Sequence, residues 1–137
     1  MILIACVDDK LGTLFNHRRQ SQDRILRERI LQLTDGKTLW MNEYSRKQFG
    51  DAALPQIRVS ETFLQEAGKG DYCFLETVDP APYEADLEQI ILYCWNRVYP
   101  ADVRFSIPLQ AHGWKLVKTT DFPGSSHDNI TEEVYTK

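Results

Sequence analysis

The sequence has few cysteines and no long apolar run. Its three cysteines, Cys6, Cys73 and Cys94, are widely spaced and lie inside apolar segments, where a free thiol behaves as a small core residue. An odd number of cysteines without close spacing argues against a disulfide framework. No segment approaches the roughly 18 consecutive apolar residues of a membrane-spanning helix, and no leading apolar region with a cleavage site is recognisable. We therefore expect a cytoplasmic protein.

The sequence also lacks an excess of positive charge. Sixteen Lys and Arg residues against 20 Asp and Glu residues give a formal charge of −4, whereas a protein that holds nucleic acid by its overall field needs clustered cations. Glycine-rich phosphate loops and the G-x-S-x-G turn of serine hydrolases are missing. His17, His112 and His127 are scattered, without metal-ligand spacing, so we expect no metal site.

What is present is the composition of one globular domain, which we assign to residues 1–137, with 42% apolar and 26% charged residues. Short apolar runs predict buried strands at residues 2–7, 38–41 and 89–95, and further strands are predicted at residues 57–59 and 72–75. Helical spacing and end signals predict helices between them, at residues 21–35, 42–49, 60–67 and 79–87.

The pattern changes in the last third of the chain. From residue 102 onward there is no long helical periodicity, and two partly alternating segments flank a polar turn at residues 123–129. Such segments are typical of antiparallel strands. The sequence therefore predicts an α/β fold, a three-layer sandwich with a mostly parallel central sheet and an antiparallel C-terminal hairpin.

The segment of residues 12–30 is the first candidate site, because a cation-rich loop runs there from a buried strand into a helix. Ser21 is the expected helix cap, and Asp23 lies in the first turn. Asp23 has two interpretations. It stabilises the positive end of the helix dipole, or it lies partly desolvated in a cleft, with a raised pKa that lets it act as a catalytic carboxylate on a protonated heterocycle.

Two polar groups complete the candidate ligand-binding residues. The first is the loop Asn16, His17, Arg18, Arg19 and Gln20, which is either ordinary solvated charge or a contact for phosphate, carboxylate or a partner. The second is Trp95, Asn96 and Arg97, just past a central strand. The carboxyl end of such a strand is where open α/β sheets bind ligands.

Several motifs in this order resemble those of dihydrofolate reductase, nearly end to end. Residues 2–12 are similar to the family's first strand and following glycine, and residues 21–23 to the start of its first helix. Residues 39–42 resemble its next strand and turn, and residues 133–135 resemble its closing hairpin. The resemblance implies a dihydrofolate-reductase-like fold and a substrate-side role for Asp23, with Asn16 in the active-site loop.

The sequence departs from that family where the cofactor would bind. After the strand at residues 72–75 the family has consecutive glycines, whereas this chain has Glu76-Thr77-Val78-Asp79-Pro80. Two acids and a proline disfavour the close approach of a diphosphate. Glu43 stands where the family has a cation, and Pro55 lacks the following arginine unless Arg58 replaces it. NADPH is therefore disfavoured, and we expect no cofactor.

Our leading hypothesis is a small-molecule or partner-binding protein on a degenerate dihydrofolate-reductase-like fold, without NADPH-dependent reductase activity. Two alternatives stay open. One is a divergent NADPH-dependent reductase of a pterin-like substrate, which would make the protein an oxidoreductase. The other is binding of RNA or an acidic partner through the basic loop at residues 16–20.

Overall fold

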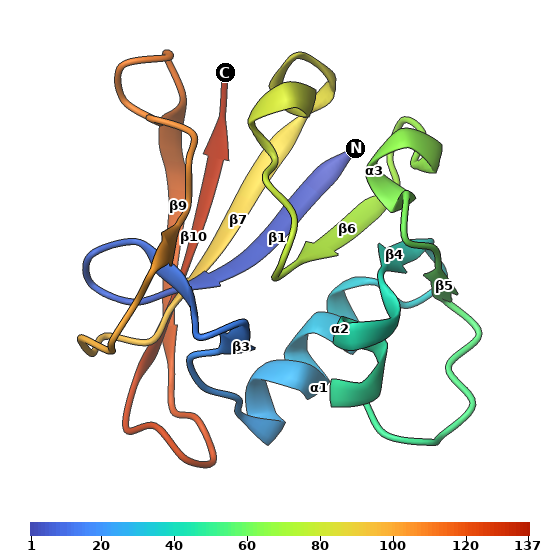
Figure 1. The fold of residues 1–137 in the computed structure, drawn as a ribbon, viewed down its shortest axis with the longest axis horizontal. Helices are drawn as coiled ribbons and strands as arrows, with labels where there is room; N and C mark the ends of the chain where they lie inside the picture. Colours follow the sequence, from blue (N-terminus) through green and yellow to red (C-terminus); the bar gives the residue numbers. More distant parts are fainter.

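The computed structural model describes residues 1–137 and is organised around a seven-stranded sheet (Figure 1). The strand order is β5-β4-β6-β1-β7-β10-β9. Neighbouring strands from β5 to β7 are parallel, and β10 pairs antiparallel with both β7 and β9. The predicted α/β fold, with a mostly parallel sheet and antiparallel C-terminal strands, is confirmed. The strands are β1 (Ile2–Val7), β4 (Leu39–Met41), β5 (Ile57–Val59), β6 (Tyr72–Leu75), β7 (Gln89–Cys94), β9 (Lys115–Phe122) and β10 (Ile130–Thr136).

A small second sheet and several short helices surround this sheet. The second sheet has the order β3-β2-β8, with β2 (Gly12–Phe15), β3 (Arg18–Arg19) and β8 (Val103–Arg104). The helices are α1 (Arg24–Leu33), α2 (Glu43–Gln48), α3 (Phe63–Glu66) and the 3₁₀ helix η1 (Ala81–Asp86). None of these helices combines the length and apolar character needed to cross a membrane.

The central strand β1 supplies both faces of the core. Successive side chains of a strand point to opposite faces, and Ile4 packs in one buried cluster with Leu26 and Ile30 of α1. The alternate residues of β1 enter a separate buried cluster, which includes Phe63 of α3, and these residues are Leu3, Ala5 and Val7. Burial on both faces explains why β1 is apolar throughout.

The parallel strands β1, β6 and β7 end at one edge of the sheet, which we call the carboxyl edge. The β2–β3 hairpin follows β1, the turn at residues 76–80 follows β6, and residues 95–101 follow β7. Both chain termini lie toward the opposite edge (Figure 1). Open α/β sheets bind ligands at the carboxyl edge, and nearly all predicted site residues lie there.

Several local predictions were wrong. Helix α1 begins after Asp23, and the side chain of Asp23 caps it. Ser21, the expected cap, does not cap the helix. Residues 12–19 form a β-hairpin where we expected an irregular loop. Residues 60–67 contain only the four-residue α3, and residues 81–86 are a 3₁₀ helix. These differences concern short elements, whose ends depend on tertiary contacts more than on local propensity.

We expect Ile30→Ala to lower the free energy of unfolding by about 2–5 kcal/mol, because it leaves a cavity under α1. Ile30 is 1% exposed. The matched control is Leu116→Ala on β9, where the side chain is 50% exposed, and we expect a change within about 0.5 kcal/mol. Urea denaturation of both variants checks this, and equal losses would contradict the packing of α1 against the sheet.

Candidate functional site

Asp23 is a fully buried hydrogen-bond acceptor that joins two parts of the chain. Its carboxylate accepts the amides of Ile25 and Leu26 at 3.0 and 3.2 Å, which caps α1. It also accepts the amides of Ser125 and Ser126 in the β9–β10 loop, at 3.0 and 2.9 Å. The start of α1 is thereby fixed to a loop about a hundred residues later in the chain.

The same loop closes over this carboxylate. His127 Nδ1 lies 3.0 Å from Asp23 Oδ2, and the His127 side chain is only 3% exposed. Gly124 is required here, because a Cβ at this position would lie 2.4 Å from Asp23 Oδ2. The loop therefore covers Asp23 so closely that no side chain fits between them.

These contacts decide the ionisation of Asp23. Burial on its own raises the pKa of a carboxyl group, but the hydrogen bonds from the Ser126 and Ser125 amides and from His127 outweigh it and hold the pKa of Asp23 well below its ordinary value. The expectation of a raised pKa is wrong, because the buried site is rich in donors. The contacts of Asp23 favour its ionised form.

The basic loop is a tight hairpin. Asn16 and His17 connect β2 to β3, and both have positive φ angles, 53° and 62°, as a two-residue type I′ turn requires. The turn sets Phe15 opposite Arg18. All four residues are exposed, so the hairpin presents an aromatic ring and a cation at its tip.

Arg19, next to Arg18, points inward and binds Glu76 at the end of β6. Its Nε and its NH2 nitrogen donate to the two Glu76 carboxylate oxygens at 2.9 and 3.1 Å. The guanidinium also lies 4.4 Å above the Tyr44 ring. The Glu76 side chain is 8% exposed and that of Arg19 is 21% exposed. We call this bidentate pair the Arg19–Glu76 latch.

Gln20 holds the hairpin to the rest of the carboxyl edge. Its Nε2 donates to Asp8 Oδ2 at 3.2 Å and to the Pro100 carbonyl at 3.4 Å. Gly12 allows this approach, since a Cβ there would lie 2.5 Å from Gln20 Nε2 and 2.6 Å from the Cβ of Ala101. Gln20 therefore links the hairpin to Asp8, which follows β1, and to Pro100, which follows β7.

The second predicted group is divided, because only Trp95 shares a small space with Arg19 and Gln20 of the first group. Trp95 is buried and stacks on the His127 ring, with centroids 4.5 Å apart. Asn96 donates to the Asn129 carbonyl and to Thr131 Oγ1, which supports the β7–β10 pairing. Arg97 is exposed, and its carbonyl accepts the amide of Asp9. These three residues stabilise the loop after β7.

Two hollows open at the carboxyl edge. The hairpin hollow, of about 250 Å³, contains four of the predicted residues and is lined by Phe15, Asn16, Arg18, Arg19, Gln20, Tyr99 and Pro100. The turn hollow, of about 270 Å³, lies between residues 75–80 and 103–106. A third space is lined by both residues of the latch and by Trp95, and it measures only about 10 Å³. Side chains, the latch among them, therefore fill the middle of the edge.

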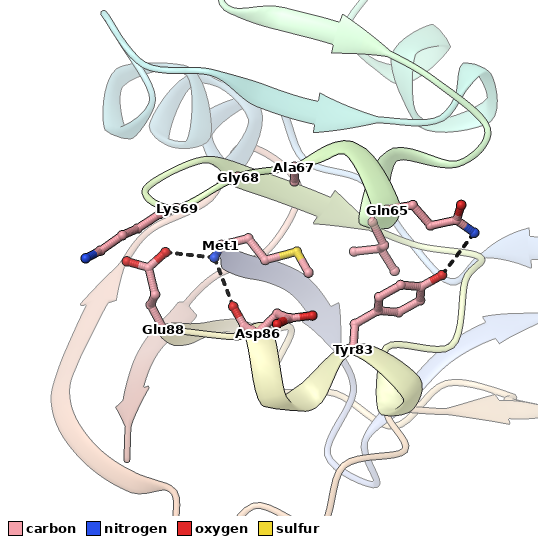
Figure 2. A pocket seen from close by; sticks show the side chains of 9 residues that line it. Met1, Gln65, Ala67, Gly68, Lys69, Tyr83, Asp86 and Glu88 are labelled. Carbon is pink, nitrogen blue, oxygen red and sulfur yellow. Dashed lines mark hydrogen bonds and ion pairs between the residues drawn. The ribbon is translucent and has the colours of Figure 1, made fainter.

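The largest hollow, about 560 Å³, lies at the opposite edge of the sheet (Figure 2). The Met1 ammonium binds Glu88 at 2.7 Å on one side of it, and Gln65 donates to the Tyr83 hydroxyl at 3.3 Å on the other. The Met1 ammonium and Glu88 thus pair with each other, while Lys69 and Asp86 add one charge of each sign to the lining. None of the predicted site residues lines this hollow.

Comparison with solved structures bears directly on this architecture. Dihydrofolate reductase from Enterococcus faecalis, complexed with NADP(H) and RAB-propyl, matches 98% of this chain and 94% of its own, with a TM-score of 0.68. The fold is dihydrofolate-reductase-like. Sequence identity is 12%, so the likeness establishes the fold alone. No protein-family model and no curated protein matches the sequence.

Sequence reasoning missed the partners of the predicted residues. Glu76 was recognised only as a charge unfavourable to a diphosphate, and its pairing with Arg19 was not expected. His127 gave no signal, because it lies 104 positions from Asp23. The meeting of the loops after β1 and β6 could have been inferred from the sequence. Neighbouring parallel strands end at the same edge of a sheet, so the loops that follow them lie close together.

We expect Asp23→Asn to lower the free energy of unfolding at pH 7 by about 1.5–3 kcal/mol, through loss of charge-assisted hydrogen bonds. The folded-state pKa of Asp23 is depressed, so its contribution is complete above the ordinary pKa of about 3.9 and is lost as the pH falls below that value. The difference from wild type should therefore shrink as the pH falls from about 5 toward about 2.

Urea denaturation across this pH range measures that difference. The matched control is Asp51→Asn, which removes an exposed carboxylate and should leave stability within about 0.5 kcal/mol at every pH. A constant difference between Asp23→Asn and wild type down to the lowest pH would contradict the depressed pKa.

Proposed function

We propose that the protein is a cytoplasmic small-molecule-binding protein on a dihydrofolate-reductase-like fold, with its ligand in the hairpin hollow and without NADPH-dependent reduction. The observation that carries the proposal is the convergence of Asn16, Arg18, Arg19 and Gln20 on one hollow of about 250 Å³. This volume suits a ligand somewhat smaller than a typical drug. The three free cysteines agree with a reducing compartment.

The lining of the hairpin hollow favours a planar anion. Phe15 is 48% exposed beside it, and Tyr99 offers a second ring. Arg18 is exposed and supplies a guanidinium, whose fork matches a carboxylate. No carboxylate side chain lines this hollow. A small aromatic carboxylate therefore matches its shape and charge.

The turn after β6 does not fit a dinucleotide diphosphate. Asp79 lines the turn hollow and carries the wrong charge for a diphosphate. Glu76 also lines it, and its two carboxylate oxygens already bind Arg19. The Ala81 amide is already bound to Asp79 at 3.1 Å, and Pro80 has no amide hydrogen. At α2, the Glu43 amide donates to another carboxylate, Glu61, at 2.9 Å. These groups support a protein that does not use NADPH.

Binding of RNA or an acidic partner through the basic loop has less support. The loop contains two adjacent arginines, but the Arg19 guanidinium is neutralised by Glu76. Arg18 is left as the exposed arginine of the hairpin tip. A single surface cation gives a weak dependence on salt and a weak attraction to phosphate.

We expect NADPH to change neither the free energy of unfolding nor the tryptophan fluorescence of the protein. A site with a dissociation constant one hundredth of the NADPH concentration would stabilise the fold by about 2.7 kcal/mol, which a urea titration resolves easily. Fluorescence titration, which reports on Trp40, Trp95 and Trp114, gives an independent measurement. Saturable quenching together with this stabilisation, or a similar response to a pterin, would overturn the proposal in favour of a divergent reductase.

We expect benzoate, used as a minimal aromatic carboxylate probe, to shift backbone NMR resonances of residues 15–20 and 99–100 in a saturable manner. Arg18→Ala should weaken this binding by about tenfold, which corresponds to 1.4 kcal/mol. The matched control is Arg58→Ala, which removes an exposed arginine on β5 and should leave binding unchanged. Shifts that appear elsewhere, or that persist in Arg18→Ala, would contradict the hairpin hollow as the site.

A further inference from the structure

Ser21, His127 and Asp23 form a continuous hydrogen-bonded chain. Ser21 Oγ lies 3.0 Å from His127 Nε2, and His127 Nδ1 lies 3.0 Å from Asp23 Oδ2. The hydroxyl and the carboxylate therefore contact opposite nitrogens of one imidazole ring. This is the connectivity of a nucleophile, a general base and an orienting carboxylate.

The contacts of Asp23 fix the tautomer of His127. The ionised carboxylate of Asp23 only accepts hydrogen bonds, so the proton of the neutral imidazole resides on Nδ1. The lone pair of Nε2 then faces Ser21, where it accepts the hydroxyl proton. Asp23 is a positioning residue in this chain, since it is separated from the hydroxyl by the full width of the ring.

Two aromatic residues hold the ring of His127 in place. Trp95 stacks on it at an interplanar angle of 25°. The hydroxyl of Tyr99 lies 3.1 Å from the same Nε2 atom, so it competes with Ser21 for the lone pair. Proton transfer requires a rigidly oriented base. The competing hydrogen bond from Tyr99 lowers the rate of proton transfer from Ser21 to His127.

Ser21 faces the middle of the carboxyl edge. It is half-buried and lines the space of about 10 Å³ that is also lined by Cys6, Trp95 and the Arg19–Glu76 latch. This space is too small for an acyl group. Both residues of the latch line this space together with Ser21. Shortening the Glu76 side chain should therefore enlarge the space and improve access to the hydroxyl.

We infer that Ser21 is an acyl-accepting nucleophile for small activated esters, with His127 as its general base and the latch as its cover. Ser21 Oγ attacks the ester carbonyl carbon while its proton passes to His127 Nε2. The carbon–oxygen bond to the leaving group breaks, His127 Nε2 gives the proton to the departing oxygen, and an acyl-Ser21 ester forms. Water then hydrolyses this ester, releases the carboxylic acid and restores the hydroxyl.

The test uses p-nitrophenyl acetate with the full chain, followed by release of p-nitrophenolate and by mass-spectrometric mapping of the acetyl group. Wild type should carry acetyl on Ser21, and Glu76→Ala should react about tenfold faster because the space is open. Ser21→Ala should lose the adduct without a change in stability. Ser60→Ala, which removes a serine after β5, should react as wild type does.

Two further variants separate this chemistry from a purely structural role. Tyr99→Phe should acetylate faster, because Nε2 then accepts from Ser21 alone. His127→Gln should acetylate at least ~100-fold more slowly, the usual contribution of a general base, and its circular dichroism shows whether it is folded. No adduct on Ser21 in wild type, Glu76→Ala and Tyr99→Phe, or equal acetylation in folded His127→Gln, overturns the inference.

Discussion

The buried carboxylate of Asp23 is the contact on which the carboxyl edge depends. It caps α1, accepts two amides of the β9–β10 loop and orients His127, which in turn packs on Trp95. A buried charge is tolerated only when its hydrogen-bonding capacity is satisfied. Because one carboxylate satisfies donors from both ends of the chain, the hairpin β9–β10 and the first helix form one unit.

The Arg19–Glu76 latch sets the shape of the rest of this edge. It places a bidentate ion pair between the β2–β3 hairpin and the turn after β6, with the Tyr44 ring against the guanidinium. Such a pair is geometrically specific as well as strong. The carboxyl edge consequently has two separate hollows, of about 270 and 250 Å³, on either side of the ion pair.

Much of the fold was predictable because burial leaves a direct trace in the sequence. Strands such as β1 and β7 are covered on both faces, so they read as short apolar runs, and their order with the intervening helices indicates a parallel sheet. The start of α2 was also predicted correctly, since its cap, Asn42, accepts the amide of Ser45, a residue close by in the chain. The cap of α1 was not, because Asp23 is preferred over Ser21 by virtue of donors from the distant loop.

The candidate site was less predictable for the same reason. Asn16 through Gln20 were identified as polar loop residues, but their separate orientations follow from the positive φ angles at Asn16 and His17. The pKa of Asp23 follows from amides that no local pattern reveals. Sequence patterns indicate whether a residue is buried. Its ionisation and its hydrogen-bond partners depend instead on which residues, distant in the sequence, lie next to it in the fold.

The central place of β1 has a consequence for how the chain folds. Its register joins Leu3 to Cys73 of β6 and to Ile90 of β7, so the middle of the sheet is made entirely of contacts between distant parts of the sequence. Closing such long loops costs entropy before the contacts form, and topologies of this kind fold slowly. Until β6 and β7 are in place, the apolar β1 is a strand without partners, and its association with other unfolded chains competes with folding.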